Sequence, residues 1–484
     1  MPTDALSDPG LLQEADELFE RDALGWLEEY TRIECLSPAF DEHWSENGHI
    51  RRAAALLADW ARQRPLAEGL RPGATVEVLE TGGLTPVVLV DVPATPARRG
   101  GGEGRPTLLY GHLDKQPPLG EWREGLGPYL PVREGDRLYG RGIADDGYSI
   151  FAALGAIEIA ERTGVGHGRC LVVVEASEES GSPHLPAYLG ELRDRLGEAG
   201  PSLVVCLDSG CLTYDRLWAT TSLRGLVGAT VRVDVLTEGV HSGGAGGVVP
   251  DSFRLLRRLL SRVEDERTGE LLLEAFHVEI PRNRRAEAED LAELLGDDAL
   301  GHFPAVAGLR LGGETLGERI LRRTWRPSVA YVGTDGLPSV RDGGNVLRPY
   351  TAMHLAIRLP PSADAKAAAE QLRERLLAEP PEGARVGVEV TGERGFDAPP
   401  TEGWLAQATD DASLAFFGQP SAKMGEGGTI PFLSMLLESY PEAQFLVTGL
   451  LGPDSNAHGV NEMMHIPTVK RLTASVAHVL SQVP

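Results

Sequence analysis

The sequence contains four short apolar runs rich in Val, Leu or Ile, and acidic or histidine side chains follow each of them. The runs are Thr107–Tyr110, Leu171–Glu175, Leu203–Leu207 and Phe445–Leu450. Continuous runs of this kind are expected of strands that are buried on both faces of a parallel sheet. The first half of the chain alternates them with helix-like segments. The sequence therefore predicts an α/β domain with a mostly parallel sheet flanked by helices.

A chain of 484 residues is too long for one ordinary core, so two domains are expected. Between the third and fourth runs, the pattern predicts a strand, a helix, two strands, a helix and a strand. The expected strands are Gly225–Leu236, Ser328–Gly333, Tyr350–Leu359 and Arg385–Val390, and the expected helices are Asp251–Arg262 and Ala363–Ala378. This order predicts an inserted α+β domain of the βαββαβ type.

The inserted domain is expected to interrupt the first one. We predict that the first domain comprises residues 1–218 and 394–484, and the inserted domain residues 219–393. Within the inserted domain, a mainly helical and acidic stretch is expected from about residue 265 to 326, and the sequence indicates no chemistry for it.

Composition excludes several classes of function. The formal net charge of -25 argues against a nucleic-acid partner, because phosphate binding needs clustered Lys and Arg. The N-terminus lacks a basic segment followed by an apolar one, so no secretory signal is expected. No run approaches the roughly 18 apolar residues that span a bilayer, so no membrane partner is expected. The 4 cysteines are too few and too irregular for a disulfide framework, so a cytoplasmic protein with buried thiols is expected.

The side chains that follow the apolar runs could together hold metal ions. The side chains after the runs are His112, Asp114, Glu178, Glu179, Asp208 and His458. A further candidate, Asp145, precedes a helix-like segment. Ligands of open α/β sheets bind beyond the carboxyl ends of the strands, so these residues are expected to converge. Imidazole and carboxylate without thiolate suit Zn²⁺, and would accept Mn²⁺ or Co²⁺. The donors exceed the needs of one ion, and would serve two ions about 3.5–4 Å apart.

Five motifs carry a resemblance to a known family. GHLD, YGRGIADDG, EASEESGS, DSG and AHGVNE resemble, in order and spacing, the M20 dinuclear zinc peptidases, particularly their carnosinase-like and cytosolic dipeptidase branch. The resemblance implies that His112 and Asp208 bind one metal, that Glu179 and His458 bind the other, and that Asp145 bridges both. It also implies that Glu178 is the general base, that Asp114 orients His112, and that the Asp145–Asp146 peptide bond is cis.

The same resemblance implies that the inserted domain is a lid and a dimerisation domain. His241, in GVHSGGAGG, would reach the oxyanion in the active site of a partner subunit, which implies a homodimer. Asn345 and Arg358 would grip a substrate carboxylate, for which bidentate Arg geometry is suited. The stretch from Glu426 to Pro431, with Gly428 and Thr429, matches a loop of the catalytic domain that lines the substrate pocket.

Two positions depart from the family pattern. Many relatives have Lys after the paired Asp residues, where this chain has Gly147. In the carnosinase branch a basic residue often precedes the loop that lines the pocket, where this chain has Gly425 with Lys423 nearby. Both departures bear on substrate preference more than on the metal chemistry.

The expected function is hydrolysis of a peptide bond in dipeptides or short peptides. Asp208 favours this interpretation, because relatives that are deacylases or carboxypeptidases tend to have Glu there. The alternative is an N-acyl-amino-acid or N-succinyl amidohydrolase with the same metal site. A third hypothesis is a non-catalytic metal- or peptide-binding relative, against which the intact ligand set and Glu178 argue.

Overall fold

The computed structural model describes residues 9–64, 73–96, 104–300, 303 and 305–484. The N-terminal residues 1–8, on which the expectation about a secretory signal partly depends, lie outside the described residues. The chain forms two compact units, which are described separately. Unit 1 comprises Met1–Thr221, Ala398–Met424 and Met435–Pro484, and unit 2 comprises Ser222–Asp397 and Gly425–Ser434. The segment Gly425–Ser434 therefore groups with unit 2, although it follows the predicted inserted domain in the sequence.

Unit 1 contains a six-stranded sheet with the strand order β1-β2-β6-β3-β7-β17. The strands are β1 (Thr75–Leu79), β2 (Val87–Val92), β3 (Thr107–His112), β6 (Cys170–Glu175), β7 (Leu203–Cys206) and β17 (Gln444–Val447). β3, β6, β7 and β17 run parallel to their neighbours among these four, whereas β1 and β2 are antiparallel additions at one edge. The parallel strands correspond to the four apolar runs, and the antiparallel pair was not predicted.

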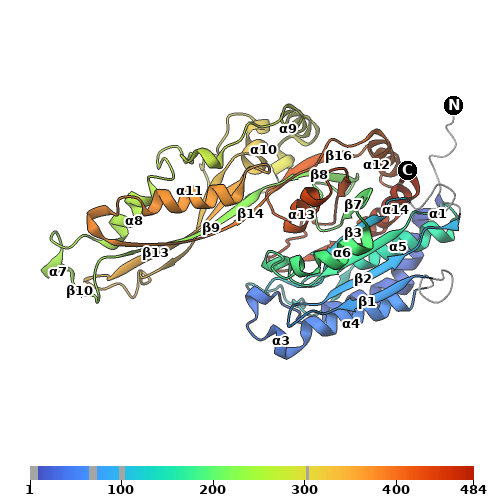
Figure 1. Cartoon of the computed structure of the whole chain (residues 1–484), viewed down its shortest axis with the longest axis horizontal. Helices are drawn as coiled ribbons and strands as arrows, with labels where there is room; N and C mark the ends of the chain where they lie inside the picture. Colours follow the sequence, from blue (N-terminus) through green and yellow to red (C-terminus); the bar gives the residue numbers. More distant parts are fainter. Residues whose placement is uncertain (1–8, 65–72, 97–103, 301–302, 304) are drawn as a thin grey trace. The chain divides into compact units, whose positions relative to one another are not determined.

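Helices pack against this sheet, and Figure 1 shows α5 and α14 on one side of it with α6 on the other. The longer helices of unit 1 are α1 (Pro9–Leu18), α2 (Leu24–Thr31), α4 (His49–Arg62), α5 (Ser149–Arg162), α6 (Leu189–Leu196), α12 (Gly403–Phe416) and α14 (Ile466–Gln482). α5 is buried along most of its length because it contacts β3, β6, α1 and α14. A small second sheet, β18-β5-β4, joins Val132–Glu134 and Arg137–Tyr139 to Met463–His465.

Unit 2 contains a four-stranded antiparallel sheet with the order β11-β13-β9-β14. Its elements are β9 (Gly225–Asp234), α8 (Ser252–Leu260), β11 (Ser328–Asp335), β13 (Tyr350–Leu359), α11 (Ala365–Leu377) and β14 (Arg385–Glu393). Buried and half-buried residues alternate along β9, because alternate side chains point to opposite faces. The buried set packs against Leu255, Leu259 and Leu372 of the two helices.

The remaining elements of unit 2 extend this core at two places. The short strands β10 (Val240–His241) and β12 (Val346–Leu347) pair beyond the end of β9, next to α7 (Ser242–Ala245). Between α8 and β11, the chain forms α9 (Arg282–Leu295) and α10 (Leu316–Thr324). The described part of the stretch from residue 265 to 326 is thus partly helical.

Three elements, β8, β16 and α13, contain residues of both units. β8 (Trp218–Leu223) forms a three-stranded sheet with β15 (Phe396–Asp397) and β16 (Ala422–Glu426). α13 (Pro431–Ser439) begins in the segment that groups with unit 2 and ends in unit 1.

All four cysteines are buried thiols. Among the described residues, every helix is too short or too polar to cross a bilayer.

Candidate metal centre and substrate-binding residues

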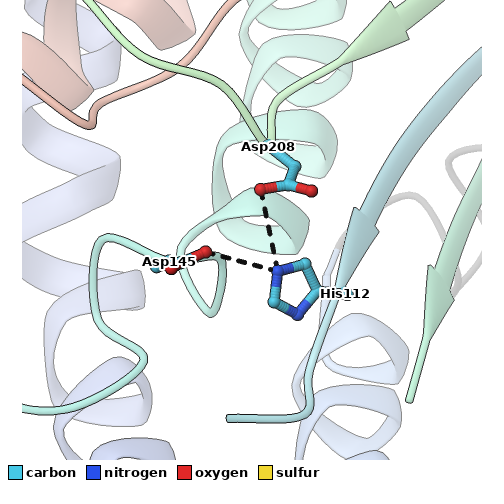
Figure 2. Close-up of side chains that lie close together, drawn as sticks. All are labelled: His112, Asp145 and Asp208. Atoms are coloured by element: carbon cyan, nitrogen blue, oxygen red, sulfur yellow. Dashed lines mark ion pairs between the residues drawn. The ribbon is translucent and has the colours of Figure 1, made fainter. Parts of the chain in front are cut away.

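The carboxyl ends of neighbouring strands in unit 1 bring the first group of candidate ligands together. His112 is the last residue of β3, and Asp208 follows the adjacent parallel strand β7. The Nε2 atom of His112 lies 3.5 Å from Oδ1 of Asp145 and 3.7 Å from Oδ1 of Asp208 (Figure 2). One donor atom from each of these three residues lies within 4.8 Å of the other two, a spacing that a single metal ion could bridge.

A second group shares Asp145 with the first. Nε2 of His458 lies 3.0 Å from Oδ2 of Asp145 and 3.2 Å from Oε2 of Glu179. The donor atoms of these three residues also lie within 4.8 Å of one another. Glu179 belongs to the short 3-10 helix Glu178–Ser180 that follows β6, and His458 lies in the loop after β17. The His458 side chain is 55% exposed, so this group opens toward solvent.

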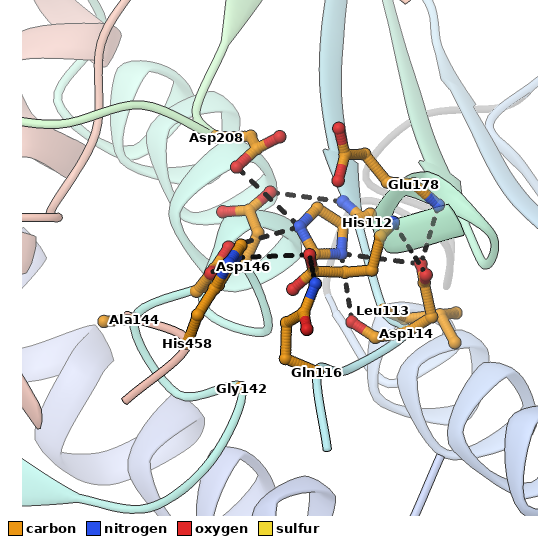
Figure 3. A network of polar contacts seen from close by, with 12 residues as sticks. His112, Leu113, Asp114, Gln116, Gly142, Ala144, Asp146, Glu178, Asp208 and His458 are labelled. Atoms are coloured by element: carbon orange, nitrogen blue, oxygen red, sulfur yellow. Dashed lines mark hydrogen bonds and ion pairs between the residues drawn. The ribbon is translucent and has the colours of Figure 1, made fainter. Parts of the chain in front are cut away.

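Polar groups next to the ligands hold them in place (Figure 3). Nδ1 of His112 donates to the backbone carbonyl of Asp114 at 3.1 Å. The carboxylate of Asp114 accepts hydrogen bonds from the backbone N–H groups of Glu178 and Glu179, each at 3.1 Å. Asp114 therefore links the end of β3 to the turn that carries both glutamates. The peptide bond between Asp145 and Asp146 is cis, as expected.

Three positioning residues were not predicted from the sequence. The buried carboxylate of Glu462 accepts hydrogen bonds from Nη1 of Arg141 at 2.7 Å and from backbone N–H groups of the turn that carries Asp145. Gln116 donates to Oε2 of Glu179 at 2.7 Å. Asp146 accepts the backbone N–H of His112 at 3.1 Å. Glu462 ends the motif AHGVNE, and Gln116 follows GHLD closely, so motif proximity was the available signal.

The charges in this pocket are unbalanced toward the negative. Burial, together with the charges of Asp208 and Glu179, raises the pKa of Glu178 well above its usual value. Burial and the charge of Asp145 raise the pKa of Glu179 to about 7. Burial alone would lower the pKa of His458, but Asp145 and Glu179 raise it to about 11. Each shift follows from crowding carboxylates in a region poor in water, where added positive charge is favourable.

The residues fit divalent metal ions on two further grounds. Nε2 of His112 and Oε1 of Glu179 are buried, and neither has a hydrogen-bond partner among the described residues. A buried polar atom without a partner is costly, and coordination of a cation would satisfy both atoms. The donors are imidazole nitrogens and carboxylate oxygens, which are ligands of Zn²⁺ and related ions.

The candidate substrate residues of unit 2 fall into two separate places. Arg358 lies in β13, where it pairs with Leu226 near the start of β9, and its Nη1 donates to Oγ1 of Thr429 at 3.1 Å. Gly428, next to Thr429, is exposed.

His241 and Asn345 lie beyond the other end of the four-stranded sheet, at the two-stranded sheet of β10 and β12. His241 is exposed in β10, and its Nδ1 accepts the N–H of Gly243 at 3.1 Å. Asn345 precedes β12, and its carbonyl accepts the N–H of Ser242 at 2.9 Å. Figure 1 shows β10 and α7 together at that end. From Arg358 to Tyr350 the rise of β13 covers about 26 Å, so the structure does not bring these two pairs together within one chain.

The two departures from the family pattern have steric explanations. A Cβ atom at Gly147 would lie 2.0 Å from Cε1 of Tyr30, so no side chain fits there. A Cβ atom at Gly425 would lie 2.7 Å from Oγ of Ser222 and 3.1 Å from Cβ of Thr324. The atoms around Gly147 leave no room for a Lys stem, whereas a side chain at Gly425 would require Ser222 and Thr324 to move.

The α/β fold and the two ligand groups that share Asp145 suit a metal-dependent hydrolase. Residues 108–482 match the model of peptidase family M20/M25/M40, and the chain belongs to this family. It is 28% identical over 388 residues to the cysteinylglycine-S-conjugate dipeptidase of Corynebacterium striatum, covering 78% of this chain and 81% of that protein. It is 23% identical over 406 residues to the human Beta-Ala-His dipeptidase, covering 79% of this chain and 74% of that protein.

A solved structure gives the same result for the fold. The di-peptidase Dug1p from Saccharomyces cerevisiae superimposes with a TM-score of 0.75 at 18% sequence identity, covering 99% of this chain and 98% of that one. At this level of identity, the likeness concerns the fold and not the substrate.

Proposed function

We propose that this metallopeptidase hydrolyses the peptide bond of dipeptides or short peptides, using two divalent metal ions held by unit 1. The observation that carries the proposal is that two groups of candidate ligands share one carboxylate, Asp145. His112 and Asp208 would hold one ion, and Glu179 and His458 the other. Zinc suits these donors best, and manganese or cobalt would be accepted. The dipeptidase names of the relatives support the substrate class.

Bound metal ions would lower the pKa of a water and polarise the scissile carbonyl. The residues of the chain supply the remaining steps. Glu178 lies beside the ligand groups (Figure 3), and its carboxylate would accept a proton from the attacking water and deliver it to the leaving amine. Asp114 would keep Glu178 in position, because its carboxylate accepts the backbone N–H of that residue at 3.1 Å. Burial raises the pKa of the Glu178 carboxyl, which suits a group that must both gain and lose a proton.

We further propose that unit 2 acts as a lid and as the dimerisation domain. Arg358, with the loop that contains Gly428 and Thr429, would bind the substrate carboxylate. His241 and Asn345 lie beyond the far end of β13, whose rise from Arg358 to Tyr350 is about 26 Å, so they would act on the substrate of a partner subunit in a homodimer. The four buried thiols suit a reducing compartment, and we propose a cytoplasmic location.

The test is mass-spectrometric product analysis on a panel of free dipeptides and N-acyl amino acids, with zinc- or manganese-loaded protein. We expect cleavage of dipeptides, its loss on treatment with a chelator, and its recovery when metal is returned. Cleavage confined to the acylated compounds would contradict the dipeptidase proposal and leave the metal chemistry intact. Cleavage that resists the chelator would contradict the metal chemistry.

A further inference from the structure

Three half-buried arginines surround one loop of unit 2, the segment from Gly425 to Thr429. Arg224 follows β8, Arg323 lies in α10, and Arg358 lies in β13. Three distant parts of the sequence therefore supply positive charge to the same short loop.

Backbone and side-chain contacts tie the loop to these arginines. The hydroxyl of Thr429 donates to the backbone carbonyl of Arg224 at 2.5 Å and accepts from Nη1 of Arg358 at 3.1 Å. A Cβ atom at Gly427 would lie 3.0 Å from Nη2 of Arg224 and 3.4 Å from the carbonyl of Arg323. Glycine at position 427 therefore allows the loop backbone to approach both arginines closely.

The positive charge of this cluster is incompletely balanced. The negative charge of Glu393 favours the charged form of Arg358, and the negative charge of Glu426 favours the charged form of Arg323. Burial, together with the charges of the two other arginines, lowers the pKa of Arg224 to about 10. Nη1 of Arg224 donates to Oγ of Ser328 at 3.0 Å, whereas its buried Nε has no hydrogen-bond partner among the described residues.

A half-buried guanidinium with an unused donor is costly unless an anion is bound beside it. Arg323 is held differently, because its two Nη atoms donate to the carbonyls of Leu300 and Ala299 at 3.1 and 3.2 Å. Arg323 therefore contributes a fixed positive charge, and Arg224 contributes a second one, whose Nη2 lies beside Gly427. Such a pair beside Arg358 is suited to a second carboxylate close to the first.

We propose that Arg224 and Arg323 form a subsite for a second carboxylate next to Arg358, so that the enzyme prefers dipeptides whose C-terminal residue is Asp or Glu. This inference rests on the proposed function, in which Arg358 binds the main-chain carboxylate of the substrate. It also accounts for the departure at Gly425. A side chain there would require Ser222 and Thr324 to move, and Arg323 supplies a positive charge from the position next to Thr324 in α10.

The test compares two dipeptides that differ only in charge, Gly-Glu and Gly-Gln, by the ratio of their kcat/KM values. For the metal-loaded wild-type enzyme we expect Gly-Glu to be favoured about 10- to 100-fold, the range of one charge-assisted hydrogen bond. Arg323→Gln should bring the ratio close to one, and Arg323→Lys should retain most of it. Arg224→Gln should have the same effect on the ratio as Arg323→Gln. This variant also removes the hydrogen bond from Arg224 to Ser328, so it changes the local structure as well as the charge.

The matched control is Arg322→Gln, which removes an exposed arginine from the same helix, and it should keep the wild-type ratio. Equal kcat/KM values for Gly-Glu and Gly-Gln in the wild-type enzyme would overturn the proposal. So would a preference that survives both Arg323→Gln and Arg224→Gln.

A binding measurement separates this inference from the proposed function. Calorimetry with chelator-treated protein should show tighter binding of Gly-Glu than of Gly-Gln, and Arg323→Gln should remove the difference. If neither dipeptide is hydrolysed but this difference is found, the proposed function fails and the subsite stands. If inorganic phosphate binds as tightly as Gly-Glu while the two dipeptides bind equally, the site is a general anion site and the substrate preference is refuted.

Discussion

The metal pocket of unit 1 and the arginine cluster of unit 2 are opposite in charge and in construction. The first crowds carboxylates such as Asp145, Glu179 and Asp208 around two imidazoles. The second brings Arg224, Arg323 and Arg358 close to a glycine-containing loop. In both places the protein buries like charges that repel one another, which is costly without a ligand of opposite charge. The sign of the excess charge indicates the ligand, a metal cation in one unit and a substrate carboxylate in the other.

The two regions also differ in how their side chains are held. In unit 1, the ends of parallel strands place the ligands, and the carboxylates of Asp114 and Glu462 fix the intervening turns through backbone N–H groups. In unit 2, Arg224 and Arg358 are joined mainly through the hydroxyl of Thr429. Loss of a charge should therefore change metal content in the first region and substrate affinity in the second.

The sharpest test of this division uses the adjacent glutamates of the metal pocket. Glu178→Gln should lower kcat on a dipeptide by about 100- to 10,000-fold, the range of general acid–base catalysis, because an amide cannot accept the proton. The variant should retain both metal ions. Glu179→Gln is the matched comparison, and it should lose metal because it removes a donor atom. Activity by dipeptide assay and metal content by mass spectrometry check both variants.

Loss of metal from Glu178→Gln, with retention in Glu179→Gln, would mean that the roles of these neighbours are reversed. Loss of metal from both variants would mean that both glutamates bind metal and that neither serves only as the general base.

Much of the metal pocket could be predicted because strand ends impose a simple rule. His112 and Asp208 each follow a buried apolar run, and parallel neighbours end at the same edge of the sheet. Strand β1 was not predicted because it is partly exposed and has no continuous apolar run. Strand β2 reads VVLVDV and is largely buried, so the same rule would have found it, and it was missed. The role of Glu462 was also beyond the sequence, since it depends on a turn that begins at Gly142, 320 residues away in the chain.

Glu462 provides a second test, because it affects the metal pocket without being a candidate ligand. Glu462→Gln should leave buried Arg141 without its carboxylate and disturb the turn that carries Asp145. We expect a metal affinity lower by about 10- to 100-fold. We also expect a loss of roughly 3–5 kcal/mol in the free energy of unfolding, as for a broken buried ion pair. Metal titration and urea unfolding measure the two effects.

The control is Asp454→Asn, which breaks an exposed ion pair with Arg137. Arg137 and Asp454 lie close in sequence to Arg141 and Glu462, the residues of the buried pair. Asp454→Asn should change the free energy of unfolding by less than about 1 kcal/mol and leave metal affinity as it is. Equal effects of the two substitutions would contradict a special role for Glu462.

The arginine cluster was predictable only in part. Arg358 was found through its motif, but Arg224 and Arg323 carry no pattern that distinguishes them among 46 Lys and Arg residues. Their significance depends on long-range packing around Gly427, which no periodicity reveals. The separation of His241 from Arg358 likewise follows from the register of β9 with β13, and a motif search gives no register.

The smallest expected effect is on substrate affinity alone, and it tests whether the division between the units holds. Arg358→Met keeps much of the side-chain volume but removes the guanidinium that contacts Thr429. We expect KM for dipeptides to rise about 10- to 100-fold, since one charge-assisted hydrogen bond is lost, with metal content unchanged. Arg385→Met, at an exposed arginine of β14, is the control and should leave KM as it is. A fall in metal content would show that Arg358 supports the fold rather than the substrate. A fall in kcat without a rise in KM would show that Arg358 acts in the transition state and not on substrate affinity. Either result would contradict the contrast between the two regions.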